Sequence, residues 1–232
     1  MKVWFASPTY GHVEPGCVSA TRVAIMSASK HGIEWAGDIS PDRMGYSDAR
    51  NFVLETVTTQ ATQADGVFWQ DSDIRPRSDS IQRLLHTAEK YGFDFLTGVY
   101  HHRRGGYRPC FYGWDEAANG FRINLIYEPD QIKPIAGCGF GFVYTSMKLI
   151  KAIEALPSFD PDRGKWFPDK RWGDVSEDLG FCLKAREAGF QLYCDSGIQV
   201  GHMGETEVIT REAYLEGLSK LGLTPKAQVD AR

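Results

Sequence analysis

Short apolar segments alternate with segments of helical periodicity over the first hundred residues, and this alternation restricts the fold more than any other feature. Strands are expected at 3–6, 33–36, 66–70 and 93–99. Helices are expected over 15–31, from about 48 and from about 78. Strands that alternate with helices favour a mostly parallel sheet with helices on both faces. The chain is therefore predicted to be an α/β protein.

Local signals set the expected helix ends. Pro15 suits the first turn of the first helix, and Gly32 follows its expected C-terminal end. Ser78 is expected to cap the third helix, because its hydroxyl can accept a hydrogen bond from a free N–H of the first turn.

The alternation ends near residue 100. Residues 101–134 contain strand-like pieces rich in Gly, Arg and aromatic residues, but no strong helix. Further helices are expected over 146–156, from 176 and over 210–221, with short strands at 191–194 and 197–200. We expect one domain over 1–222, divided into 1–100 and 101–222, with a polar tail at 223–232.

Composition excludes several classes of protein. A net charge of −4 gives no overall positive field for nucleic acid or anionic lipid. The chain has no run of about 18 apolar residues and no signal-peptide pattern, which favours a soluble cytoplasmic protein without a membrane segment. Its five cysteines form no Cys-x-x-Cys pair and are expected to be buried free thiols. The oligomeric state stays open.

An acidic tripeptide, Asp71-Ser72-Asp73, directly follows the third expected strand. Carboxylates are costly beside an apolar segment unless something pairs with them. Two of them one residue apart form a hard oxygen site suited to a divalent cation, and open α/β sheets bind ligands at this end of their strands. The alternative is an Asx turn or a helix cap, but Ser78 is better placed as the cap. We predict a metal–nucleotide site.

Three more carboxylates, Asp174, Glu177 and Asp178, lie around the start of the helix at 176. Acidic residues in a first helical turn favour the positive end of the helix dipole, which alone could account for them. The nearby aromatic residues are Trp166, Phe167 and Trp172. The alternative prediction is a site that binds and deprotonates a hydroxyl group, with apolar neighbours raising the pKa of Asp178.

His202 follows a strand-like run and lies between Gly201 and Gly204. A lone histidine is usually a surface or core residue. A neutral imidazole can also join carboxylate oxygens around Mn²⁺, so His202 is a candidate third ligand.

These features, in this order, resemble the GT-A glycosyltransferases, in particular the family-2-like enzymes with a DXD motif. The resemblance covers most of the chain, from residue 7 to 202. Its motifs are Ser7-Pro8-Thr9, Ala49-Arg50-Asn51, Asp71-Ser72-Asp73, the glycine-rich stretch Gly137-Cys138-Gly139-Phe140-Gly141, Glu177-Asp178 and His202.

The resemblance implies a GT-A fold, a Rossmann-like α/β/α sandwich with a mostly parallel central sheet and a smaller acceptor-side region. Residues 1–100 would form the nucleotide-sugar-binding half and 101–222 the acceptor and catalytic half. The implied activity is metal-dependent transfer of a hexose or pentose from a nucleotide-sugar, expected to be a UDP-sugar, to a hydroxyl acceptor, with inversion. A glycan, a small molecule and hydroxymethylated phage DNA are left open as acceptors.

The resemblance also implies roles for single residues. Asp73, helped by Asp71, would hold a Mn²⁺ or Mg²⁺ that bridges the donor diphosphate, with His202 as a further ligand. Asp178 would be the catalytic base, with Glu177 beside it. The other donor-side residues would be Pro8, Thr9, Asp38, Arg50 and Ser72. The acceptor-side residues would be Gly139, Trp172 and Asp174.

Two other functions compete with this one. A sugar-phosphate nucleotidyltransferase would need a basic glycine-rich loop after the first strand, and residues 7–11 contain no Lys or Arg. A non-catalytic nucleotide- or glycan-binding module stays open. The basic segment 101–108 is either a solvated loop or an electropositive flap over a diphosphate or an anionic acceptor.

Overall fold

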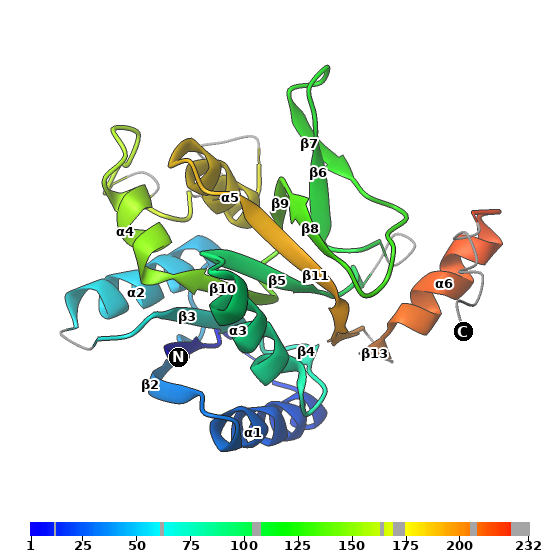
Figure 1. Ribbon diagram of the computed structural model, residues 1–232, viewed down its shortest axis with the longest axis horizontal. Helices are drawn as coiled ribbons and strands as arrows, with labels where there is room; N and C mark the ends of the chain where they lie inside the picture. Colours follow the sequence, from blue (N-terminus) through cyan, green and yellow to red (C-terminus); the bar gives the residue numbers. More distant parts are fainter. Residues whose placement is uncertain are drawn as a thin grey trace.

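A seven-stranded sheet forms the centre of the computed structural model, which describes residues 1–11, 13–60, 63–103, 108–162, 165–168, 175–204 and 208–223 (Figure 1). Its strands, in sheet order, are β2 (Glu34–Ile39), β1 (Lys2–Ala6), β3 (Gly66–Gln70), β10 (Phe142–Ser146), β5 (Phe95–Val99), β11 (Leu192–Gln199) and β8 (Ile132–Ile135). Strand β10 runs antiparallel to both its neighbours, and β8 runs antiparallel to β11. The other strands share one direction, which confirms the predicted mostly parallel sheet.

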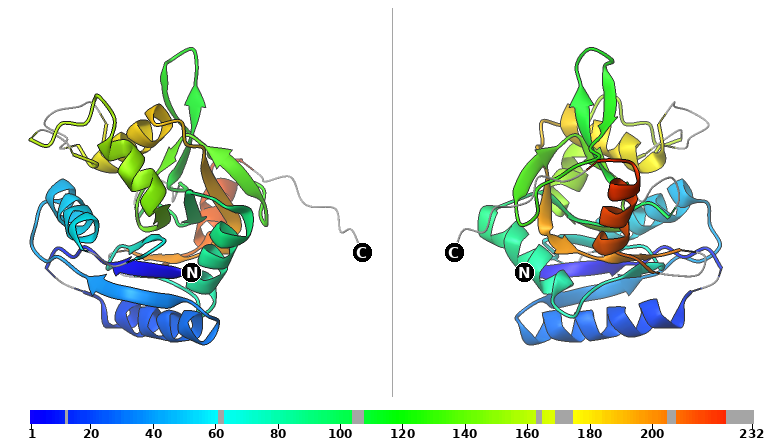
Figure 2. Two further views of the ribbon diagram at one scale, coloured as in Figure 1. Left: turned by 60° about the vertical axis from the view of Figure 1, so that its left-hand side comes forward. Right: turned by 90° about the vertical axis from the view of Figure 1, so that its right-hand side faces the viewer.

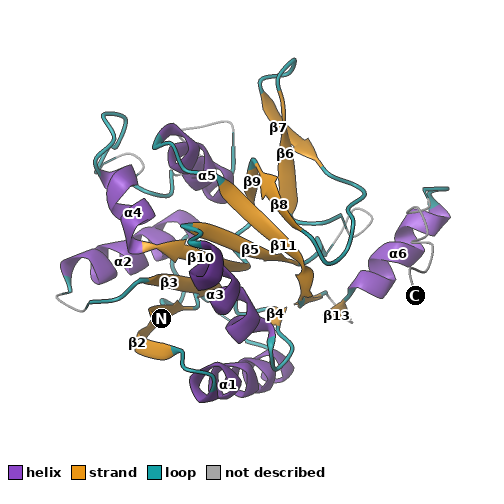
Figure 3. Cartoon of the chain, viewed as in Figure 1, coloured by secondary structure: helices purple, strands orange, loops and turns teal. Residues whose placement is uncertain are grey.

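Helices cover both faces of this sheet (Figures 2 and 3). One face carries α1 (Pro15–Lys30) and α3 (Ser80–Tyr91), and the other carries α2 (Tyr46–Thr59), α4 (Met147–Glu154) and α5 (Glu177–Glu187). Every residue of β3 is buried, and its side chains alternate between two apolar cores. Val67 and Trp69 belong to one core and Phe68 to the other. This double coverage explains why β3 is apolar throughout.

Two small sheets and a last helix complete the fold. One sheet consists of β13 (Val208–Ile209), β12 (Gly201–Met203) and β4 (Ile74–Arg75), in that order. The other consists of β7 (Gly120–Ile123), β6 (Phe111–Asp115) and β9 (Gly137–Cys138), and its β6–β7 hairpin projects away from the central sheet (Figure 2). Helix α6 spans Arg211–Lys220. Pairing of β12 with β4 sets His202 opposite Ile74.

The structure corrects two expectations about elements. The strands expected at 191–194 and 197–200 are one strand, β11, whose pairing with β5 shifts register between Cys194 and Gln199. The residue before α3 is Asp79, not Ser78; the Ser80 hydroxyl instead accepts a hydrogen bond from the Arg77 N–H.

The expectation for the cysteines is confirmed. All five cysteines are free and buried. Within the described part of the chain, none of the helices combines the length and the apolar character needed to cross a membrane.

Candidate functional site

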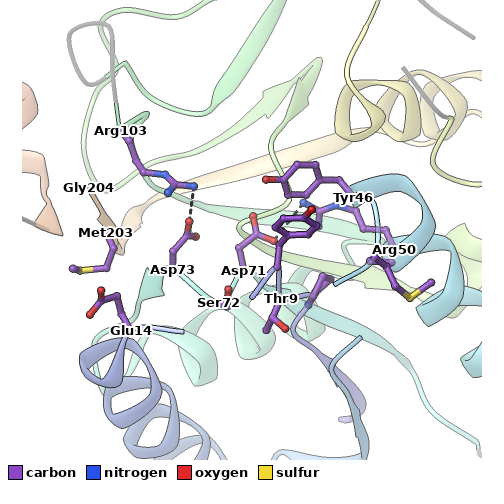
Figure 4. A pocket seen from close by; sticks show the side chains of 14 residues that line it. Thr9, Glu14, Tyr46, Arg50, Asp71, Ser72, Asp73, Arg103, Met203 and Gly204 are labelled. Carbon is purple, nitrogen blue, oxygen red and sulfur yellow. Dashed lines mark hydrogen bonds and ion pairs between the residues drawn. The ribbon is translucent and has the colours of Figure 1, made fainter. Parts of the chain in front are cut away.

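A cavity of about 310 Å³ lies beside the carboxyl ends of β1 and β3 (Figure 4). Six of the predicted donor-side residues line it: Pro8, Thr9, Arg50, Asp71, Ser72 and Asp73. The sequence did not single out Tyr10, Glu14, Tyr46 and Met203, which also line it, and it indicated Arg103 only as part of a basic segment. The acidic tripeptide therefore faces a cavity.

Asp73 is held by two cationic or potentially cationic side chains. Its Oδ2 atom lies 2.6 Å from Arg103 Nη2, the contact drawn as a dashed line in Figure 4, and 3.5 Å from His202 Nε2. Burial alone would raise the pKa of Asp73, but His202 and Arg103 outweigh it and hold the pKa below its ordinary value. Asp73 is therefore an anion at neutral pH. Its Oδ1 atom is buried and has no hydrogen-bond partner among the described residues.

The His202 ring is oriented by the backbone. Its Nδ1 lies 2.7 Å from the His101 carbonyl oxygen, and since a carbonyl only accepts, Nδ1 carries the hydrogen. In the neutral ring, Nε2 then turns its lone pair toward the Asp73 carboxylate, an arrangement that a cation between the two groups would stabilise. Histidine ligands of metals commonly donate their second ring N–H to a carbonyl in this way.

The donor atoms around Asp73 therefore fit a divalent cation. Asp73 supplies an unpartnered carboxylate oxygen and His202 a lone pair, and these are ligand types that Mn²⁺ accepts. Asp71 points into the same cavity (Figure 4) but pairs with Arg50. Across the described ranges, no three His, Cys, Asp or Glu side chains are arranged as a complete metal site.

Arg50 links the acidic tripeptide to the acids of α5. Its Nη2 lies 3.4 Å from Asp71 Oδ1, and its Nε lies 3.0 Å from Asp178 Oδ1. The Arg50 side chain is only 4% exposed, and its guanidinium carbon lies 5.3 Å from the Phe140 ring centre and 5.8 Å from that of Phe167. A charge this deeply buried requires counter-charges, which the two aspartates supply. Arg50 is thus largely enclosed by protein although it borders the cavity.

Asp178 lies in the first turn of α5, which Ser176 caps by accepting a hydrogen bond from the Leu179 N–H. Its Oδ2 accepts a hydrogen bond of 3.0 Å from the Phe140 N–H. Burial raises the pKa of Asp178 to about 7, although Arg50 acts in the opposite direction. A carboxyl group with a pKa near neutrality can exchange a proton efficiently. The raised pKa matches the expectation for this residue.

Glu177 precedes Asp178 in the same helical turn and is partly exposed. Trp166 and Phe167, expected beside these acids, are both buried. Trp172 and Asp174 lie outside the described residues.

The glycine-rich stretch lets two polar side chains come close to the backbone. A Cβ atom on Gly141 would lie 2.7 Å from Tyr100 Cζ, and one on Gly139 would overlap the Tyr100 hydroxyl. The same Cβ on Gly139 would lie 3.5 Å from Asp178 Oδ2. Gly139 therefore separates Tyr100 from the candidate base, and its missing side chain is required by this packing.

The loop after β1 is held by an aspartate that the sequence did not single out. Asp42 Oδ1 accepts hydrogen bonds from the Gly11 N–H (3.2 Å) and the Thr9 hydroxyl (3.1 Å). These two hydrogen bonds lower the pKa of Asp42. Asp38, the predicted donor-side residue, is exposed near the end of β2, accepts a hydrogen bond from Ser40 and is not among the residues that line the cavity.

Comparison with known proteins supports the fold. No protein-family model matches the sequence, and no curated protein matches it. Among solved structures, the chain is similar to A197 from STIV, with a TM-score of 0.59 and 19% identity over 92% of each chain. It is also similar to GalNAc-T7 with UDP, GalNAc and Mn²⁺, with a TM-score of 0.53 and 11% identity over 94% of this chain and 48% of that one. These likenesses confirm a GT-A-like α/β fold.

Proposed function

We propose that this protein is a glycosyltransferase that moves a sugar from a nucleotide-sugar to a hydroxyl group. The observation that carries the proposal is the cavity lined by the loop after β1 and by Asp71-Ser72-Asp73, with His202 paired to Asp73 beside it. Its position at the carboxyl ends of β1 and β3 is the usual ligand position in an open α/β sheet. The similarity to a protein solved with UDP, GalNAc and Mn²⁺ supports the same activity.

The nucleotide would bind at the side of the cavity formed by Pro8, Thr9, Tyr10 and Tyr46. Tyr10 and Tyr46 are 70% and 66% exposed, and their ring centres lie 6.4 Å apart. Exposed aromatic rings at the rim of a polar cavity offer a flat apolar face to a nucleobase or a sugar. A uridine diphosphate is the expected nucleotide.

The diphosphate would bind at the acidic side of the cavity. Its negative charges cannot lie directly against Asp71 and Asp73, so a bridging cation is required. Asp73 and His202 would hold Mn²⁺ or Mg²⁺, with Asp71 nearby. The metal would stabilise the negative charge that develops on the leaving diphosphate. Arg103, half exposed and already at the cavity, would turn from Asp73 to a phosphate oxygen.

Asp178 would act as the general base. In its ionised form it would accept the proton of the acceptor hydroxyl as that oxygen bonds to the anomeric carbon and the bond to the diphosphate breaks. One such displacement inverts the anomeric configuration. Glu177 would adjust the charge beside Asp178, and Gly139, Trp172 and Asp174 would border the acceptor. In this proposal residues 1–100 supply most of the donor site and 101–222 the acceptor site.

The direct test is a panel of nucleotide-sugars, each measured by thermal shift and by release of free nucleotide, with and without Mn²⁺. The proposal expects one donor to raise the melting temperature only with the metal, and to release its nucleotide when a hydroxyl acceptor is added. Asp73→Ala should remove both effects. Intact sugar transfer by Asp73→Ala in the presence of Mn²⁺ would contradict the metal assignment.

A second candidate function is a nucleotide-binding module without turnover. It is favoured by one observation: Asp73 and Asp178, the candidate metal ligand and base, are each already paired with an arginine. This function predicts the thermal shift with UDP and Mn²⁺ but no nucleotide release with any acceptor in the panel.

A further inference from the structure

A second cavity, of about 250 Å³, lies on the ribbon formed by β4 and β12. Three arginines line it: Arg75 at the end of β4, Arg77 just beyond it, and Arg211 at the start of α6. The ribbon connects the two cavities along the chain. Gly201 of β12 lines the second cavity, whereas Met203 of the same strand lines the donor cavity.

The three guanidinium groups have little local compensation. In the described part of the chain, no carboxylate forms an ion pair with Arg75, Arg77 or Arg211. The Nε atom of Arg211 is moreover buried and has no hydrogen-bond partner there. Arginine side chains at a cavity without paired acids are the usual binding groups for phosphate oxygens.

Glu212 is the one acid among the described residues that line this cavity. Its pKa is lowered, mainly by a hydrogen bond from the Thr210 hydroxyl and its own N–H, with smaller contributions from Arg77 and Arg211. Thr210 caps the start of α6, and Glu212, in the first turn, also interacts with Arg77 and Arg211. Among the described residues that line the cavity, one carboxylate is outnumbered by three guanidinium groups.

This charge is local, because the whole chain carries a net charge of −4. Proteins that bind long nucleic acids need positive charge along an extended surface, whereas this cavity is small and is bordered by one ribbon and one helix end. Its size suits one phosphate group with a few attached atoms, since sites for larger ligands typically exceed about 300 Å³.

We propose that this cavity binds the phosphate group of a small phosphorylated molecule, held by Arg75, Arg77 and Arg211. Asp73 lies in the turn directly before β4 and Arg75 lies within β4, so this cavity and the donor cavity are adjacent along the chain.

The binding test uses inorganic phosphate and ribose 5-phosphate, titrated by calorimetry with EDTA present so that the donor cavity holds no metal. Both should bind the unmodified protein. Arg77→Gln and Arg211→Gln should each weaken binding about tenfold, and the double variant should abolish it. The matched control is Arg22→Gln, which removes the same charge from an exposed position on α1. Equal affinity in the double variant, or equal loss in the control, would overturn the proposal.

Three further measurements separate the possible outcomes. Unchanged melting temperatures of the variants show that the loss of binding is not unfolding. Ribose should not bind, and binding equal to that of ribose 5-phosphate would contradict phosphate recognition. Binding of a single-stranded oligonucleotide but not of ribose 5-phosphate would instead assign the cavity to a polymer.

Failure of the proposed function is distinguishable from failure of this inference. Binding of UDP with Mn²⁺ reports on the donor cavity, should be lost in Asp73→Ala, and should be kept in Arg77→Gln. Phosphate binding with EDTA that is lost in the Arg77→Gln, Arg211→Gln double variant reports on the second cavity.

Discussion

Arg50 Nε lies 3.0 Å from Asp178 Oδ1, so the carboxylate proposed as catalytic base is paired with a buried guanidinium. The same guanidinium reaches Asp71 at 3.4 Å. One cation therefore sets the distance between the acidic tripeptide after β3 and the first turn of α5. We infer that Arg50 is a positioning residue, which holds the donor side and the acceptor side of the site at a fixed distance from each other.

Replacing Arg50 should therefore damage stability as well as activity. Arg50→Met leaves two partly buried carboxylates without their counter-charge, a loss of about 3 kcal/mol in the free energy of unfolding. Arg50→Lys keeps the charge but cannot reach both aspartates, so it should cost less stability yet still lower kcat. Urea unfolding and steady-state kinetics measure the two effects. The exposed control, Arg22→Gln, should stay within about 0.5 kcal/mol, and an equally small change in Arg50→Met would refute the role.

Activity should depend on pH through Asp178. Its pKa in the folded protein is about 7, above the ordinary 3.8, because burial disfavours the charged form. A base must be ionised, so kcat/KM should rise with pH through about 7 and then level. Asp178→Asn should lower kcat by about 10²–10⁴-fold, abolish this rise, and leave donor affinity unchanged. Equal loss of donor affinity and of kcat would argue against a base.

The raised pKa of Asp178 also makes the folded protein less stable as the pH rises. Between pH 4 and 7 the folded protein holds a proton on Asp178 that the unfolded chain has released. The stabilising contribution of that proton is complete below pH 4 and is lost as the pH rises through 7. The Asp178→Asn variant lacks this titration. Its free energy of unfolding, measured with urea, should therefore fall less between pH 4 and 7 than that of the unmodified protein.

The sequence predicts the half of the fold that depends on local order. Alternating strands and helices over the first hundred residues correctly give the parallel strands, and the apolar run 66–70 gives β3. The insertion of β10 between β3 and β5 was not predicted, because strand pairing across some seventy residues is not encoded in local periodicity. The sequence also predicts two strands where the structure has the single strand β11. Gly197 suggests a strand end, but a shift in the pairing of β11 with β5 accommodates it.

Some residues of the candidate site are likewise predictable from local sequence, and others are not. Asp71, Asp73 and Asp178 follow from acids placed at the ends of expected elements. Asp42 and Tyr46 reach the β1 loop and the cavity rim through a turn whose shape the sequence does not reveal. The orientation of His202 likewise depends on the His101 carbonyl, a contact across 101 residues.

Arg103 should have opposite effects on metal and donor. Its guanidinium pairs with Asp73 Oδ2 at 2.6 Å, so Arg103→Gln removes a competitor for the proposed metal and should tighten Mn²⁺ binding several-fold without nucleotide. The variant should bind the complete nucleotide-sugar more weakly, because a cation for the diphosphate is lost. Calorimetry with Mn²⁺ alone, and then with UDP added, measures both. If Arg103→Gln raised both affinities or lowered both, Arg103 would not move from Asp73 to the diphosphate.

Asp38 and Asp42 provide a matched pair of exposed acids for the nucleotide side of the site. Asp42 accepts hydrogen bonds from Thr9 and Gly11 in the loop that lines the cavity, whereas Asp38 accepts one from Ser40; neither aspartate is itself among the described lining residues. Asp42→Ala should therefore release the β1 loop and raise the Kd for UDP with Mn²⁺ about tenfold, the equivalent of one or two hydrogen bonds. Asp38→Ala should change it less than twofold. The reverse result would mean that the end of β2, rather than the turn after it, contacts the nucleotide.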